Sequence, residues 1–175
     1  MQVIVNYFLS KFRLLTSTYC VGTATASEWP HDIYASSRIS DRKSIFLAHA
    51  STLPNATSFP SFLAYLTSLP TLKRATHCMY AYRTSDLLAS QPVLGQNDGG
   101  ESGSGDRLAR LLELAGCENT VVVVSRWYGG VHLGSDRWRL ISSVANEALS
   151  LGGFKRPKPQ SEGKKGPANP GKRHK

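Results

Sequence analysis

The chain has 175 residues, of which 41% are hydrophobic and 19% are charged. This composition suits one compact domain and excludes both a long disordered protein and a collagen-like repeat. No stretch reaches the roughly 18 uninterrupted apolar residues of a membrane span, so we expect a soluble protein with no membrane partner.

The formal net charge of +9 suggests an anionic partner such as nucleic acid, but most of this charge lies near the end of the chain. Residues 155–175 hold eight of the 21 Lys and Arg residues and one of the 12 acidic residues, so the other 154 residues carry a net charge of only +2. The segment has four prolines and no apolar side chain larger than that of Ala168. We therefore expect a disordered basic tail, through which RNA binding is an alternative.

The beginning of the chain gives weaker signals. Residues 1–27 contain no acidic residue and two cations, a composition that faintly resembles a mitochondrial transit peptide. The cysteines Cys20, Cys78 and Cys117 are odd in number and far apart, which favours reduced intracellular thiols over a disulfide framework or a zinc site. We expect a poorly defined extension over residues 1–30 and a cytoplasmic protein, with a mitochondrial location as the alternative.

Strand and helix patterns alternate in the first half of the folded part. One strand is expected near Thr18–Ala26 and another near Ile33–Ser40, and the short apolar run Ser44–Ser51 predicts a buried strand. Apolar residues at helical spacing then predict a helix over 59–69, with Pro60 in its first turn and Pro70 just after it. The segment Thr76–Arg83 alternates aromatic and smaller residues, as strands do.

The second half contains the clearest helix and the clearest strand. Leucines at 108, 111 and 112 share one helical face, which Ser104 or Asp106 can cap and Gly116 can end. The four valines Val121–Val124 predict a strand buried on both faces. A last helix is expected over Asp136–Leu149, with Gly152 and Gly153 after it. These patterns predict helices packed on one sheet over residues 31–154.

Two glycine-rich loops have a composition too specific for ordinary connectors. They are NDGGESGSGDRL, residues 97–108, and SRWYGGVHLGSDR, residues 125–137. Both lead into helix starts close to arginines. The candidate binding residues are Asp98, Gly99, Glu101, Gly103 and Gly105 in the first loop, and Arg126, Trp127, Tyr128, Gly129, Gly130, His132, Gly134, Asp136 and Arg137 in the second.

These loops allow a functional and a structural interpretation. Glycine turns before helices can bind a phosphate through backbone N–H groups. Alternatively the glycines form tight turns, Ser135 or Asp136 caps the last helix, and Arg126 or Arg137 pairs with an acid of the first loop, Asp98 or Glu101. Three acids in the first loop would repel a phosphate, which favours the structural interpretation, and a protein-docking rim is compatible with either.

Catalytic and metal-binding templates are absent from the sequence. The glycines around Ser102 and Ser104 do not form a GxSxG elbow, and the five histidines form no HExxH or similar spacing. Glu101 with His132 is the one acid/base pair that we consider, which makes a hydrolase a further alternative. We expect no catalytic residue, no metal and no cofactor.

Four segments together resemble a known family. DRKSIFLAHA (41–50), RATHCMYAYR (74–83), NDGGESGSGDRLARLLEL (97–114) and NTVVVVSRWYGGVHLGSDRWRLI (119–141) occur in the order and spacing of the IMPACT family, which includes the bacterial YigZ proteins. The resemblance covers about residues 36–150, and LGSDRWRLI is similar to the eukaryotic, fungal-type branch.

The resemblance implies both a fold and a role. The fold is a two-layer α+β sandwich with helices on one face of a four-stranded mixed sheet, similar to the second domain of a small-subunit ribosomal protein. Eukaryotic members regulate translation without known catalysis: they oppose activation of the general-control kinase by competing for its large ribosome-associated activator. The implied partner is therefore a protein of translation control, either the kinase activator or a ribosome-associated factor.

The chain departs from this pattern in two places. About 30 residues precede the shared segment, too few for the RWD domain that binds the activator, so we expect that domain to be missing. Gly100 looks inserted and Asp106 is an unexpected acid, which favours a turn or protein contact over a phosphate cradle. We expect a non-enzymatic regulatory module in translation and stress response. A nucleic-acid or ribosome-binding domain that uses the loops and the basic tail is the alternative.

Overall fold

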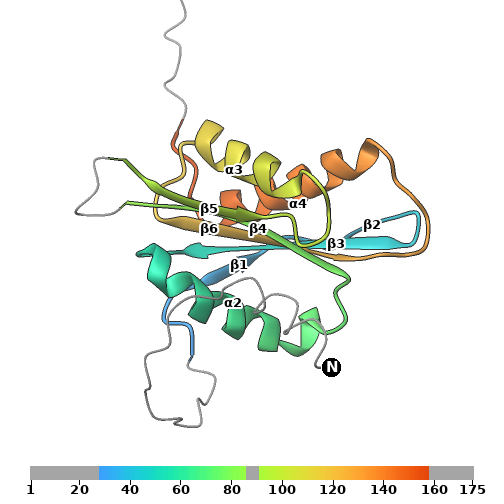
Figure 1. Ribbon diagram of the computed structural model, residues 1–175, viewed down its shortest axis with the longest axis horizontal. Coiled ribbons are helices and arrows are strands. Elements are labelled where there is room, and N and C mark those ends of the chain that lie inside the picture. The colour runs from blue at the N-terminus through green and yellow to red at the C-terminus, as the bar shows by residue number, and fades with distance from the viewer. Residues whose placement is uncertain (1–27, 86–90, 158–175) are drawn as a thin grey trace, which may run out of the picture.

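The computed structural model describes residues 28–85 and 91–157, which form one sheet with helices on both of its faces (Figure 1). The strand predicted near residues 18–26, most of the predicted N-terminal extension and the basic tail beyond residue 157 lie outside these residues. Among the residues that the structure describes, none of the helices combines the length and the apolar character that crossing a bilayer requires.

The sheet is antiparallel throughout, in the order β1-β3-β6-β4-β5, with the short β2 also paired to β3. Its strands are β1 (Ile33–Ala35), β2 (Ile39–Asp41), β3 (Ser44–Thr52), β4 (His77–Thr84), β5 (Val93–Asn97) and β6 (Thr120–Trp127). The predicted strands at 44–51, 76–83 and 121–124 are confirmed, and the one near 33–40 is divided into β1 and β2.

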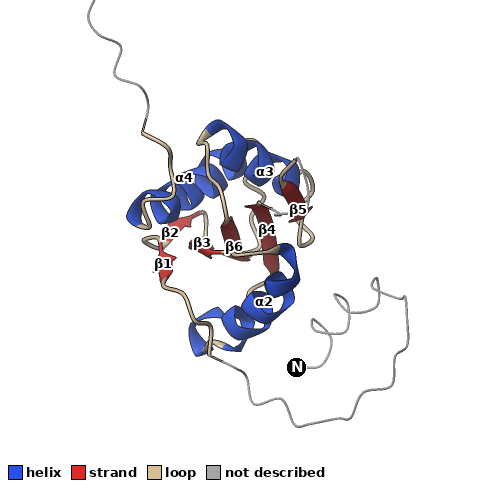
Figure 2. Ribbon diagram, turned by 90° about the vertical axis from the view of Figure 1, so that its left-hand side faces the viewer, coloured by secondary structure: helices blue, strands red, loops and turns tan. Residues whose placement is uncertain are grey.

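Within the described ranges, three α-helices cover the sheet. They are α2 (Phe59–Ser68), α3 (Ser104–Leu114) and α4 (Asp136–Leu151), with short 3-10 turns η1 (Ala56–Ser58) and η2 (Pro70–Leu72) beside α2. Figure 2 shows α3 and α4 on one face and α2 on the other. Gly116 and Gly153 adopt φ values of 64° and 66° shortly after α3 and α4, so these helices end where the sequence predicts.

The α+β class is confirmed, but three expected details are wrong. The described sheet has six strands instead of four, its pairing is purely antiparallel instead of mixed, and helices cover both faces instead of one. The pattern at 59–69 predicts the helix α2 correctly but says nothing about the face on which it packs. The segment that forms β5, VLGQN, is short and polar, so its sequence indicates a loop instead of a strand.

The central strand β6 explains why helices are needed on both sides. Val122 and Val124 belong to the core under α3 and α4, whereas Val121 and Val123 belong to the core under α2. All four valines are completely buried, as the unbroken apolar run predicts. With two cores, both surfaces of β6 are removed from water, and the strand is a rigid base for the loop that follows it.

A buried histidine makes the stability of this fold depend on pH. His49 of β3 is 5% exposed, and its Nδ1 has no hydrogen-bond partner among the described residues. Burial, together with the nearby charge of Arg38, lowers the pKa of His49 from 6.5 to about 4. Between these two values the unfolded chain binds the proton more tightly than the folded chain does, so stability falls as the pH falls through this window.

We expect His49 to contribute a loss of about 2 kcal/mol in the free energy of unfolding between pH 7 and pH 5. Urea unfolding at both pH values, compared between the wild type and His49→Gln, measures this contribution. The variant should lose correspondingly less stability over this interval. Equal losses in the two proteins would show that His49 does not cause the pH dependence.

Candidate functional site

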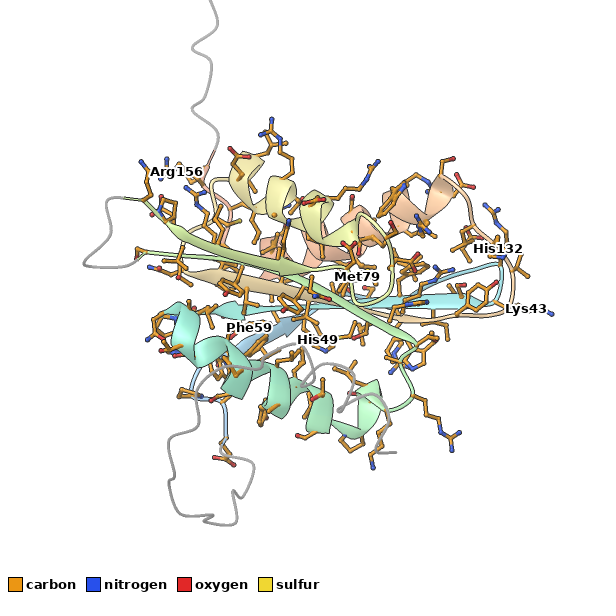
Figure 3. All side chains as sticks on the ribbon, viewed as in Figure 1. Lys43, His49, Phe59, Met79, His132 and Arg156 are labelled. Atoms are coloured by element: carbon orange, nitrogen blue, oxygen red, sulfur yellow. The ribbon has the colours of Figure 1, made fainter. Side chains whose placement is uncertain are left out.

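Both glycine-rich loops lie at one end of the sheet. Because β4 is antiparallel to both β5 and β6, these two strands run in the same direction and end at the same edge. The turn between β2 and β3 lies at this edge too, since β3 is antiparallel to β6. Figure 3 shows Lys43 and His132 there, at the end opposite Arg156. We call residues 42–44, 97–105 and 126–137 the loop edge.

The first loop is held together by Asp98. Its carboxylate accepts hydrogen bonds from the N–H groups of Gly103 at 2.9 Å and Gly105 at 2.8 Å, and its carbonyl accepts from Glu101 N at 2.8 Å. Asp98 therefore satisfies backbone donors at the start of α3, although it lies several residues before the helix. The predicted caps are wrong: Gly103 is the N-cap, and the Ser104 hydroxyl donates to the Glu101 carbonyl at 2.6 Å.

The same loop lies directly on the start of β4. Gly99 has φ 56°, and a Cβ at this position would lie 2.1 Å from the carbonyl oxygen of Cys78. The carbonyl oxygen of Gly99 lies 3.3 Å from Nδ1 of His77. Only glycine allows both this backbone conformation and this approach.

A buried carboxylate joins the two loops. Glu101 is 3% exposed and pairs with two arginines of the second loop: Arg126 Nη1 contacts Oε2, and Arg137 Nη1 lies 2.7 Å from Oε1. His77 Nε2 lies 4.0 Å from Oε2. The pairing between loops that the sequence suggests is therefore present, and Glu101, not Asp98, is the acid that both arginines contact.

Arg126 is enclosed at the end of β6. In the sheet it is flanked by Phe46 of β3 and His77 of β4, and its Nη2 donates to the Ser44 hydroxyl at 3.3 Å. Its guanidinium lies 5.1 Å from the ring of Tyr128 and 5.3 Å from that of Phe46. With 4% of its surface exposed, Arg126 directs its charge into the protein and toward Glu101.

The second loop is anchored to the β2–β3 turn. Gly129 N donates to the Ser44 hydroxyl at 3.3 Å, and a Cβ on Gly129 would lie 2.1 Å from the Lys43 carbonyl oxygen. Arg42 and Lys43 have φ values of 45° and 64°, the positive values that a two-residue hairpin turn requires. Arg42 also pairs with Asp136, so this acid contacts the turn and does not cap α4.

Several side chains of the loop edge face the solvent. Tyr128 is 38% exposed and Val131 is 39% exposed, two of the five exposed large hydrophobic residues in the described part of the chain. His132 is exposed beside Tyr128, with ring centroids 5.9 Å apart. Gly130 and Gly134 have positive φ values and open space around them. Trp127 is half-buried, and its Nε1 donates to the Lys73 carbonyl at 3.2 Å.

This arrangement does not supply an acid/base pair. Both carboxylate oxygens of Glu101 already contact arginines, and the histidine within 4.0 Å of it is His77, not His132. Among the described residues, no group of three or more His, Cys, Asp and Glu side chains could hold a metal ion. Glu101 and the two arginines therefore connect the two loops to each other.

Sequence reasoning missed the residues on the other side of the loop edge. Arg42, Lys43 and Ser44 contact or support the second loop, and His77 lies beside Glu101. A turn with two positive φ values is usually signalled by Asn-Gly, and the sequence here is Arg-Lys. The pattern therefore gives no sign of the tight hairpin.

Comparison with known proteins gives a consistent result. The family model described as "Impact N-terminal domain" matches residues 42–149. "Protein IMPACT homolog" of Schizosaccharomyces pombe is 41% identical over 114 residues, which cover 65% of this chain and 40% of that protein. "IMPACT family member YDL177C" of Saccharomyces cerevisiae is 37% identical, and the match covers 65% of this chain and 88% of that protein.

Two solved structures are similar as well. One, described as "Structure of two-domain translational regulator Yih1 reveals a possible mechanism of action", has 30% identity and a TM-score of 0.49, and covers 79% of this chain and 54% of that chain. The other, a hypothetical protein with 17% identity, has a TM-score of 0.54 over 67% of this chain and 60% of that one, and it supports the fold. The chain spans 40–46% of the length of the IMPACT homologues from S. pombe, Caenorhabditis elegans and S. cerevisiae.

Proposed function

Because the chain belongs to the IMPACT family, we propose that it is a non-enzymatic regulator of translation that binds a protein partner through the loop edge. The observation that carries this proposal is the clamp formed by Glu101, Arg126 and Arg137. In this clamp the carboxylate and the two guanidinium groups are paired with one another instead of being free for a catalytic step. The pairs also fix the two loops to each other. The exposed residues of the loop edge are therefore held in one conformation, which lowers the entropy cost of binding a partner.

The exposed part of the loop edge has the composition of a contact surface. Tyr128 and Val131 offer an aromatic and an aliphatic side chain, and Arg42 and Lys43 add two exposed cations on the adjacent turn. Aromatic and arginine side chains are enriched among the residues that dominate binding energy at protein interfaces. A partner that fits would present an apolar pocket with acidic residues at its rim.

The proposed setting follows from the family resemblance. The chain acts in the cytoplasm in a stress response and opposes activation of the general-control kinase by occupying the ribosome-associated activator of that kinase. Tyr128 and Val131 would contact the activator directly, together with the cations of the β2–β3 turn. Lys73 and Arg74, exposed on the neighbouring segment before β4, would extend this contact.

The test compares a surface variant of the loop edge with a matched control. Tyr128→Ser combined with Val131→Ser removes the apolar contacts, whereas Leu94→Ser removes an exposed leucine, 59% accessible, from β5. Each protein is overproduced in stressed cells, and phosphorylation of the translation initiation factor on which the general-control kinase acts is measured. The wild type and the Leu94 variant should lower phosphorylation, and the loop-edge variant should not.

Binding measurements with the purified activator separate the outcomes. We expect the loop-edge variant to bind about tenfold or more weakly, with the control unchanged. Equal binding by all three proteins would refute the role of the loop edge. The nucleic-acid alternative predicts instead an affinity for RNA that falls steeply with salt and depends on residues 155–175.

A further inference from the structure

A second surface, which reaches the end of the molecule opposite the loop edge, lies on the helical layer. It is an open groove of about 590 Å³ at α3, α4 and the segment that leaves α4. Its lining residues are Arg107, Arg110, Leu111, Leu114, Ala115, Ser142, Asn146, Lys155 and Arg156. Figure 3 shows Arg156 at the end of the molecule opposite Lys43 and His132. The proposed function makes no use of this groove.

The apolar part of the groove is unusually open to solvent. Leu111, Leu114 and Ala115 come from the last turn of α3 and the residue after it. Leu114 is 73% exposed, the highest value among the exposed large hydrophobic residues in the described ranges. Covering a leucine of this exposure with an apolar side chain would contribute roughly 1.5 kcal/mol or more. The groove therefore offers an anchoring point for an aliphatic side chain.

Cations surround this apolar floor. Arg107 is stacked on Trp138, with its guanidinium carbon 4.4 Å from the ring, and Arg110, Lys155 and Arg156 line the remaining sides. The nearby acids are Glu113, paired with Arg110 at 2.7 Å, and Glu118, paired with Arg156 at 2.8 Å. More than half of each side chain in these pairs is exposed, so both ion pairs are weak. The two arginines can therefore pair with the carboxylates of a partner instead.

The two terminal segments outside the described residues do not have the charge to fill the groove. Residues 1–27 contain no acidic residue, and residues 158–175 contain six cations and one acid, Glu162. The net positive charge of residues 158–175 does not complement the cations that line the groove. An acidic occupant therefore has to come from outside these segments.

We propose that this groove binds an acidic amphipathic helix of a partner protein. A leucine of that helix would lie over Leu111 and Leu114, and its carboxylates would pair with the surrounding arginines and Lys155. Single-stranded RNA is a poorer fit, because RNA-binding grooves stack bases on aromatic rings and the lining residues include none. The site is thus a second contact, independent of the loop edge.

The experiment uses the full chain and a synthetic fluorescent helix with leucines at i and i+4 flanked by glutamates. Leu114→Ser tests the apolar floor, and Arg110→Glu combined with Arg156→Glu tests the cations. Leu94→Ser is the control, since this leucine is 59% exposed on β5 and is not among the residues that line the groove. We expect binding to weaken about tenfold in both groove variants and to stay within about twofold in the control.

Three further probes make the result decisive. A polyglutamate peptide and a uridine-rich RNA should bind more weakly than the helix and should not respond to Leu114→Ser. The Tyr128→Ser, Val131→Ser variant should bind the helix normally, which separates this site from the loop edge. Equal binding of polyglutamate, stronger binding of the RNA, or an unaffected Leu114→Ser variant would each overturn the proposal, as would the absence of helix binding.

Discussion

Glu101→Gln is expected to lower the free energy of unfolding by about 3 kcal/mol or more. The substitution keeps the shape of the side chain but removes the negative charge that faces two arginines. The Glu101 and Arg126 side chains are 4% and 5% exposed, so water cannot replace the lost partner. Removing one partner of a buried ion pair leaves the other charge uncompensated, which costs about 3 to 5 kcal/mol in stability.

The matched control is Asp106→Asn, which removes the charge of an exposed acid in the first turn of α3. Its cost should be below about 1 kcal/mol, because it loses a surface contact and a helix-dipole interaction. Urea unfolding of both variants measures the difference. Glu101→Leu with Arg126→Met should recover part of the loss, since it removes both charges of the most buried pair and leaves only Arg137, which is 28% exposed to solvent. A similar cost for Glu101→Gln and Asp106→Asn would argue against a buried clamp.

Gly129→Ala is expected to cost about 3 kcal/mol, the second large effect. Its new Cβ would lie 2.1 Å from the Lys43 carbonyl oxygen and 2.2 Å from the carbonyl carbon. Backbone atoms cannot move aside as a flexible side chain can, so the loop would separate from the β2–β3 turn. This displacement would also disturb the hydrogen bond from Gly129 N to the Ser44 hydroxyl.

The neighbouring glycine is the control for this prediction. Gly130 has φ 84°, but a Cβ added there would meet no described atom within 4 Å, so Gly130→Ala introduces backbone strain without a clash. It should cost about 1 kcal/mol. Thermal or urea unfolding gives the loss of stability in each variant. Comparing the two losses separates the cost of the steric clash at Gly129 from the cost of the backbone conformation at Gly130. A Gly130→Ala variant that is the less stable of the two would contradict the packing described for the loop edge.

Much of the fold could be predicted from local patterns. The valines of β6 indicate a strand buried on both faces, and the leucines of α3 indicate one apolar helix face. Both patterns arise because the side chains of one continuous segment are buried, so they can be recognised in the sequence. The strand β5 gives no such pattern, and its Gly95 is explained only by the ring of Tyr82, which lies where a Cβ would be.

The candidate site could be predicted only in part, because its contacts join distant segments. The sequence suggests that an arginine of the second loop pairs with Asp98 or Glu101, and only the structure shows that both arginines contact Glu101. Asp98 is left to bind the N–H groups of Gly103 and Gly105. The two acids are three residues apart, and their roles depend on the turn made by the glycines between them.

Hydrogen–deuterium exchange of Glu101→Gln tests most directly whether the clamp makes the two loops one unit. If Glu101 holds both arginines, the amides of residues 97–105 and 128–135 lose protection together, while those of the central strand β6 stay protected. Faster exchange in the first loop alone, with residues 128–135 as protected as in the wild type, would contradict the account.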